Sequence, residues 1–162
     1  MNLFKKQPHY SKTNWPNHFK EEVNQMTALE IAKYIVQKYG EDKNTVTNSM
    51  LQYALYLIQE KTWLRYHHYA FSDDIEARKS GPVIPSVYNY YSTYGEGSLP
   101  KVTGKKQPIL SPWLKDIADN VLLKIRRKGS ETIIKEITAK GSPWENTYTK
   151  GRKVIYISNY MY

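Results

Sequence analysis

Histidine and acidic residues that could perform chemistry gather between residues 67 and 76. His67 and His68 are adjacent, and Asp73, Asp74 and Glu76 follow them closely. Paired carboxylates can act in acid–base catalysis or bind a cation. Neighbouring residues of a helix or strand point in different directions, so the two histidines are poorly placed to share a metal ion. Because no EF-hand spacing, His-Glu-x-x-His motif or cysteine accompanies them, a solvated turn or a contact with a basic partner is favoured.

The sequence contains no motif for a nucleotide or for a catalytic nucleophile. Ser80-Gly81-Pro82 precedes an expected helix, but it lacks the glycine-rich spacing and the Lys-Ser/Thr pair of a P-loop. No serine lies in a Gly-x-Ser-x-Gly context. We therefore expect a protein that is not an enzyme, with no metal site and no cofactor.

The net charge of +9 is concentrated in residues 101–128, which carry eight Lys or Arg and two Asp. Such a basic segment can attract nucleic acid or an acidic protein partner. A solvated lysine surface is the favoured explanation, and the dipole of the expected helix 112–128 favours cations in its last turn. No helix-turn-helix or RNP motif accompanies the bases. The candidate partner contacts in this segment are Lys101, Lys105, Lys106, Arg126 and Arg127.

Apolar residues at helical spacing predict about five helices in a chain of 162 residues. They cover approximately residues 27–40, 47–66, 85–95, 112–128 and 130–141. Extended stretches are expected near residue 76 and over residues 152–157, and Pro143-Trp144 is expected to begin a loop. The predicted fold is mainly α, of the α+β class: a compact helical domain with a small β-hairpin or a two- to three-stranded sheet.

The domain boundaries follow from the same patterns. Residues 1–26 contain Pro8 and Pro16 and no periodicity, so they are predicted to form an N-terminal arm, and residues 27–162 form one domain. No apolar run is long enough to span a membrane, and the N-terminus has no apolar region typical of a signal peptide. The absence of cysteine fits a reducing compartment. We therefore expect a cytoplasmic protein without membrane contact.

The 15 tyrosines of the chain suggest half-buried sites and interfaces, because a tyrosine has an apolar body and a polar tip. Tyr88, Tyr91 and Tyr94 recur on one side of the expected helix 85–95, so we expect them in the core. Tyr90 falls on another side and is a candidate anchor for a partner.

Four motifs occur in a fixed order along the chain. They are ALEIAKYIV from residue 28, LQYALYLIQ from residue 51, a long Phe-x-Asp-x-Ile-Glu-Ala motif and Ser-Pro-Trp at residues 142–144. The third motif continues to Gly-Pro-Val-x-Pro-x-Val-Tyr and ends at Tyr88. Together these motifs resemble the Panacea domain family, which includes SocA-like antitoxins and phage-associated GepA proteins. The resemblance implies a structural signature at Phe71, Asp73, Glu76, Gly81, Pro82, Val83, Tyr88 and Trp144.

This resemblance implies a non-enzymatic antitoxin of a phage or mobile element, which neutralises a cognate toxin encoded nearby by binding it directly. One subgroup of the family resembles adaptors that deliver a toxin to a protease. The chain departs from the family at Arg78, where tryptophan is frequent, so Arg78 joins Tyr90 as a candidate partner contact. Two alternatives stay open: inhibition of a host defence nuclease, and binding of nucleic acid through residues 101–128.

Overall fold

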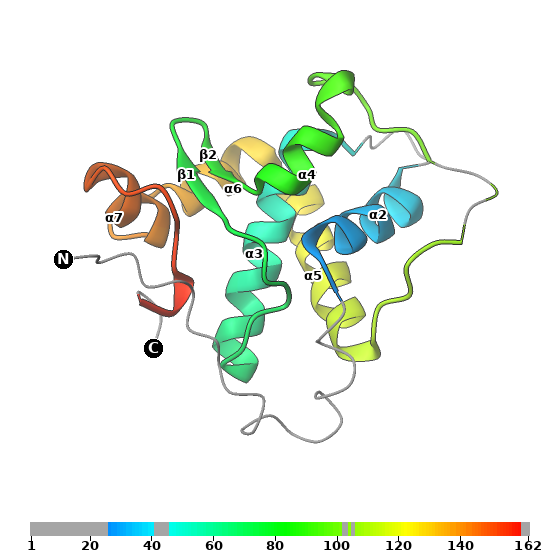
Figure 1. The fold of residues 1–162 in the computed structure, drawn as a ribbon, viewed down its shortest axis with the longest axis horizontal. Coiled ribbons are helices and arrows are strands. Elements are labelled where there is room, and N and C mark those ends of the chain that lie inside the picture. Colours follow the sequence, from blue (N-terminus) through cyan, green and yellow to red (C-terminus); the bar gives the residue numbers. More distant parts are fainter. Residues whose placement is uncertain (1–25, 41–45, 102–103, 105, 160–162) are drawn as a thin grey trace.

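Helix α3 (Asn48–Tyr66) runs through the centre of the computed structural model, and the other elements pack around it (Figure 1). Twelve of its 19 residues are buried, as expected of a helix that contacts neighbours on every side. Helices α2 (Ala28–Tyr39) and α5 (Pro112–Lys128) lie on one side of it, and the β-hairpin and α7 (Pro143–Thr149) lie on the other.

The structure describes residues 26–40, 46–101, 104 and 106–159. Within these ranges it contains six α-helices and one two-stranded antiparallel sheet, which confirms the predicted α+β class. Lys105 and the predicted arm lie outside the described residues, except for Met26, which packs against the core. None of the described helices has the length and apolar character needed to cross a membrane. The elements not yet named are β1 (Glu76–Arg78), β2 (Gly81–Val83), α4 (Pro85–Tyr90), η2 (Ser92–Tyr94), α6 (Ser130–Ile137) and η3 (Ile157–Asn159).

Buried polar side chains of α3 hold the segments that cross it. Gln59 is fully buried; its Oε1 accepts a hydrogen bond from the N–H of Ala70 at 2.7 Å, and its Nε2 donates to the carbonyl of Phe71 at 2.8 Å. Two turns earlier in α3, Gln52 Oε1 accepts a hydrogen bond from the N–H of Ile84 at 2.8 Å. Buried backbone groups without partners would destabilise the fold, so these side chains fix the course of both segments.

The β-hairpin pairs Glu76 with Val83 and Arg78 with Gly81. The chain after α7 runs beside β1, but it forms only an isolated bridge between Glu76 and Val154. The prediction of an extended strand over residues 152–157 was therefore wrong in extent. The 3₁₀-helix η3 then begins at Ile157 and ends the extended stretch.

The predicted loop at Pro143-Trp144 is also wrong, because these residues begin helix α7. Ser142 caps this helix, and its Oγ accepts a hydrogen bond from the N–H of Glu145 at 3.1 Å. Proline is well suited to the first helical position, where its missing N–H would have no partner within the helix. By contrast, the helix predicted over residues 27–40 is confirmed as α2, and it begins with a capping box in which Thr27 and Glu30 are bonded reciprocally.

Candidate functional site

Three exposed tyrosines project from α4 and η2. The exposed fractions of Tyr88, Tyr90 and Tyr94 are 40%, 53% and 45%, whereas Tyr91 is buried at 6%. The expectation of core packing is therefore confirmed for Tyr91 and wrong for Tyr88 and Tyr94. Helix α4 ends at Tyr90 and continues as a 3₁₀-helix, so the spacing of 3.6 residues per turn does not carry on to Tyr94. Val87 and Tyr91 occupy the inward side instead.

The short helix α4 is fixed at both ends by the rest of the fold. Ser86 donates a hydrogen bond to Asp73 Oδ1 at 2.6 Å, in the first turn. At the other end, Asn48 Nδ2 donates to the carbonyl of Tyr88 at 3.0 Å. The exposed tyrosines therefore stand on a backbone that is already ordered.

Arg78 lies next to Tyr88, with its guanidinium carbon 5.7 Å from the ring centroid. The guanidinium also pairs with Glu76 at 2.9 Å, and the Arg78 carbonyl accepts a hydrogen bond from Trp144 Nε1 at 2.9 Å. On the other side of α4, the Lys33 ammonium lies 5.1 Å from the ring centroid of Tyr90. We call Tyr88, Tyr90 and Tyr94, together with Arg78 and Lys33, the tyrosine face.

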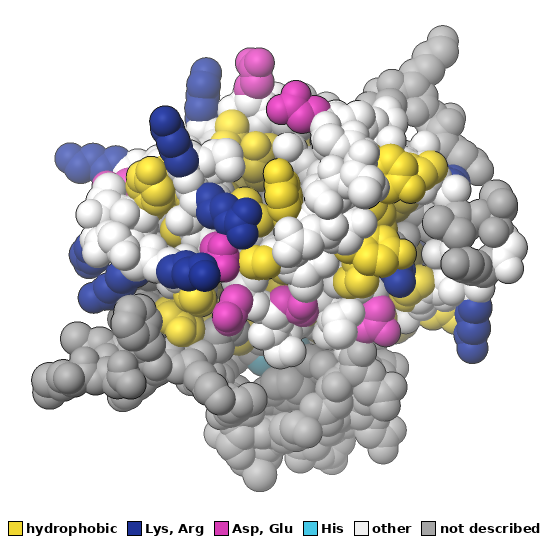
Figure 2. Space-filling view, turned by 45° about the horizontal axis from the view of Figure 1, so that its top comes forward, with side chains coloured by type: hydrophobic (Ala, Val, Ile, Leu, Met, Phe, Trp, Pro, Cys, Tyr) yellow, Lys and Arg dark blue, Asp and Glu magenta, His cyan; other side chains and the backbone are white. Residues whose placement is uncertain are grey.

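In Figure 2, which brings α4 and the β-hairpin forward, most basic side chains lie on the left of the view with hydrophobic side chains between them, and further hydrophobic side chains lie on the right. Basic residues near the hairpin come from two distant parts of the sequence, because Glu76 pairs with both Arg78 and Lys153, the latter at 3.3 Å. Tyrosine and arginine are enriched in protein–protein interfaces, whereas lysine is depleted from them, so the exposed tyrosines and Arg78 are the residues here that favour an interface.

A pocket of about 300 Å³ opens between α2 and the α4–η2 segment. Tyr90, Tyr91 and Tyr94 line it together with Lys33 and Lys106. Burial, followed by the nearby Tyr90 and Tyr94 hydroxyls, raises the pKa of Tyr91 to about 12, so its hydroxyl stays protonated at neutral pH. Of the sequence-predicted contacts, the pocket brings together Tyr90 and Lys106. Lys33 was missed because a single lysine on a helix carries no signal of its own.

Among the described residues, the other basic contacts predicted in segment 101–128 do not line this pocket. Arg126 donates a hydrogen bond to the carbonyl of Tyr39 at 3.2 Å, and its guanidinium carbon lies 4.8 Å from the Tyr39 ring centroid. Arg127 is exposed in the last turn of α5, and Lys101 is half-buried. The basic residues of segment 101–128 therefore lie at several separate places. Of those that the structure describes, only Lys106 lines the pocket.

Two of the three residues of the acidic cluster, Asp73 and Glu76, make structural contacts, whereas Asp74 is exposed. Asp73 accepts hydrogen bonds from α2 and α4, and Glu76 pairs with two basic residues. Burial lowers the pKa of His68. Over residues 26–40, 46–101 and 106–159, no group of three or more His, Cys, Asp or Glu side chains is placed to hold a metal ion.

Signature residues inferred from the family resemblance are mostly buried or join two elements. Phe71 and Val83 are buried, Pro82 lies in β2, and Trp144 links α7 to the hairpin. Tyr88 differs from these, because its ring is exposed. Comparisons of the chain with protein families, curated proteins and solved structures gave no match. The resemblance to the Panacea family stays a prediction from the four motifs.

Proposed function

We propose that the chain is a non-enzymatic, protein-binding antitoxin that masks a cognate toxin by docking it on the tyrosine face. The observation that carries this proposal is the exposure of three tyrosines: Tyr88 and Tyr90 on the short helix α4, which is fixed at both ends, and Tyr94 on the 3₁₀-helix η2 that follows it. Large, rigid aromatic side chains gain contact area on binding while losing little conformational entropy. The resemblance to the Panacea family supports the choice of a toxin as partner.

The toxin would be encoded beside this chain, and both proteins would act in the cytoplasm. The absence of cysteine from the sequence agrees with a reducing compartment. Binding alone would be sufficient for neutralisation. An adaptor that delivers the toxin to a protease is a variant of the same proposal, and a fall in toxin level on co-expression distinguishes it.

Co-expression of the chain with its neighbouring gene product tests the proposal. We expect the chain to restore growth and to co-purify with the product. Tyr90→Ala and Tyr94→Ala should each weaken binding by about tenfold or more, as for aromatic residues at the centre of an interface. Leu123→Ala is the matched control, because Leu123 is also 53% exposed but lies on α5. Absence of both rescue and complex would overturn the proposal.

The purified chain also distinguishes the alternative functions from the antitoxin function. Capture of a host nuclease, with a neighbouring gene product that is not toxic, would support the nuclease-inhibitor alternative instead. Binding of nucleic acid should weaken steeply with salt. That alternative receives less support from the structure, because Lys115, Lys124 and Lys128 of the basic segment already pair with carboxylates.

A further inference from the structure

The pocket beside the tyrosine face has a positive and aromatic lining. Two lysines, Lys33 and Lys106, and three tyrosines contribute to it, and none of the described lining residues is acidic. A volume of about 300 Å³ suits one or two side chains, since it lies at the small end of ligand pockets. The chemistry that complements this lining is an anion with an adjoining apolar part.

The two lysines keep their charges available for a ligand. Within the described residues neither Lys33 nor Lys106 forms an ion pair, whereas Lys38 and Lys115 both pair with Asp119. The acidic residue one turn before Lys33 is Glu30. Its carboxylate accepts a hydrogen bond from the N–H of Thr27 at 2.6 Å in the capping box, so it is engaged at the start of α2.

We propose that this pocket binds an acidic side chain of the partner polypeptide, with its carboxylate paired to Lys33 and Lys106 and its methylenes against Tyr90 and Tyr94. This inference rests on the proposed function and names the chemistry of the partner segment. A phosphate backbone fits less well, because it requires a row of basic residues along its path. Here the pocket supplies two, and Arg126 contacts Tyr39 elsewhere.

Selection of random peptides displayed on phage against the purified full chain tests this assignment. We expect the selected peptides to carry Asp or Glu at a fixed position next to an apolar residue. A fluorescein-labelled copy of a selected peptide should bind the Lys33→Gln/Lys106→Gln variant roughly tenfold more weakly than the unchanged chain. Exchange of the acidic residue of the peptide for its amide should produce a similar loss without altering the protein.

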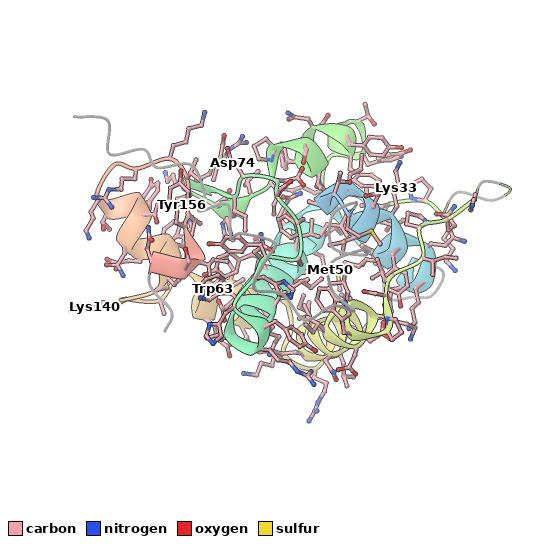
Figure 3. The ribbon with its side chains drawn as sticks, turned by 60° about the horizontal axis from the view of Figure 1, so that its bottom comes forward. Lys33, Met50, Trp63, Asp74, Lys140 and Tyr156 are labelled. Carbon is pink, nitrogen blue, oxygen red and sulfur yellow. The ribbon has the colours of Figure 1, made fainter. Side chains whose placement is uncertain are left out.

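Lys140→Gln is the control, because Lys140 is exposed and lies at the opposite end of the molecule from Lys33 (Figure 3). This variant should bind the peptide as the unchanged chain does, and circular dichroism should show that all variants are folded. The assignment is overturned if no peptide is enriched, if the enriched peptides lack acidic residues, or if the double variant binds them equally well. Lysine-dependent binding of labelled oligothymidylate, without acidic peptides, would overturn it in favour of a phosphate ligand.

The outcome is independent of the co-expression test. If acidic peptides bind through both lysines but the chain fails to rescue growth, the assignment of the pocket stands and the antitoxin function is rejected. If the double variant rescues growth and forms the complex as the unchanged chain does, the antitoxin function stands and the pocket is not part of the interface.

Discussion

The carboxylate of Asp73 caps helix α2 from 45 residues away along the chain, because its Oδ2 accepts a hydrogen bond from the N–H of Ala28 at 2.8 Å. The other oxygen of the same carboxylate accepts from Ser86 in α4. A negative charge at a helix N-terminus is favourable, and the backbone N–H groups there have no partner within the helix. Asp73 therefore joins the starts of the two helices that border the pocket.

Replacing Asp73 by alanine should lower the free energy of unfolding by about 1–3 kcal/mol, because the N–H of Ala28 and the hydroxyl of Ser86 both lose their acceptor. Urea denaturation followed by circular dichroism measures this loss. Asp74→Ala is the control, because Asp74 is exposed, and we expect a change of less than about 0.5 kcal/mol. Equal losses in the two variants would contradict a specific capping role.

A side chain at Gly81 is expected to destabilise the fold. Its φ is +123°, and a Cβ there would lie 2.6 Å from Ile134 Cδ1. Gly81→Ala should therefore cost about 1–3 kcal/mol in the free energy of unfolding. In Gly151→Ala the new Cβ would meet nothing within 4 Å, at a φ of +66°, so the loss should be smaller. The order of the two midpoints in thermal unfolding checks this prediction, and the reverse order would refute it.

Helices with a strong local pattern could be predicted from the sequence. The capping box at Thr27 and the proline at the start of α5 mark both helices at their first turns. Helix α7 carried a similar signal, with Ser142 as the cap, Pro143 at the first helical position and Glu145 two residues later. Pro143-Trp144 was nevertheless predicted to begin a loop.

Features that depend on distant partners could not be predicted from local patterns. The burial of Gln52 and Gln59 is possible only because backbone groups of other segments bind their side chains. The basic segment appeared uniform in the sequence, but Lys124 and Lys128 both pair with Glu136 of α6. The pocket likewise depends on the packing of α2 against the α4–η2 segment, and no single sequence motif predicts this packing.

Trp144 should stabilise the β-hairpin locally. Trp144→Phe preserves an aromatic ring to stack on Tyr148 and removes the Nε1 donor to the carbonyl of Arg78. We expect a loss of about 1 kcal/mol in the free energy of unfolding. Hydrogen exchange should accelerate more at the amides of residues 76–83 than at those of α5, because the missing bond permits local opening. Equal acceleration in both regions would show that Trp144 acts only on global stability.

Protonation of Asp119 should lower the stability of the fold at acidic pH. Its carboxylate accepts hydrogen bonds from Lys38 at 2.7 Å, Lys115 at 2.8 Å, Tyr39 at 2.7 Å and Tyr34 at 3.0 Å. Burial alone would raise the pKa of Asp119, but these bonds outweigh burial and hold the pKa well below its usual range. The ionised carboxylate therefore links α2 to α5.

Because the pKa of Asp119 is lower in the folded state, its stabilisation is fully present above the unfolded value of about 4 and is lost as pH falls towards the folded value. Asp119→Asn should thus cost about 1–2 kcal/mol at neutral pH, and the difference from the unchanged chain should shrink below about pH 4. Urea denaturation of both proteins at neutral pH and below about pH 4 measures this difference in the free energy of unfolding. Asp116→Asn is the control, because Asp116 and its partner Arg65 are both 60% exposed and 3.5 Å apart. A pH-independent difference for Asp119→Asn would show that this carboxylate stabilises the fold by packing and not by its charge.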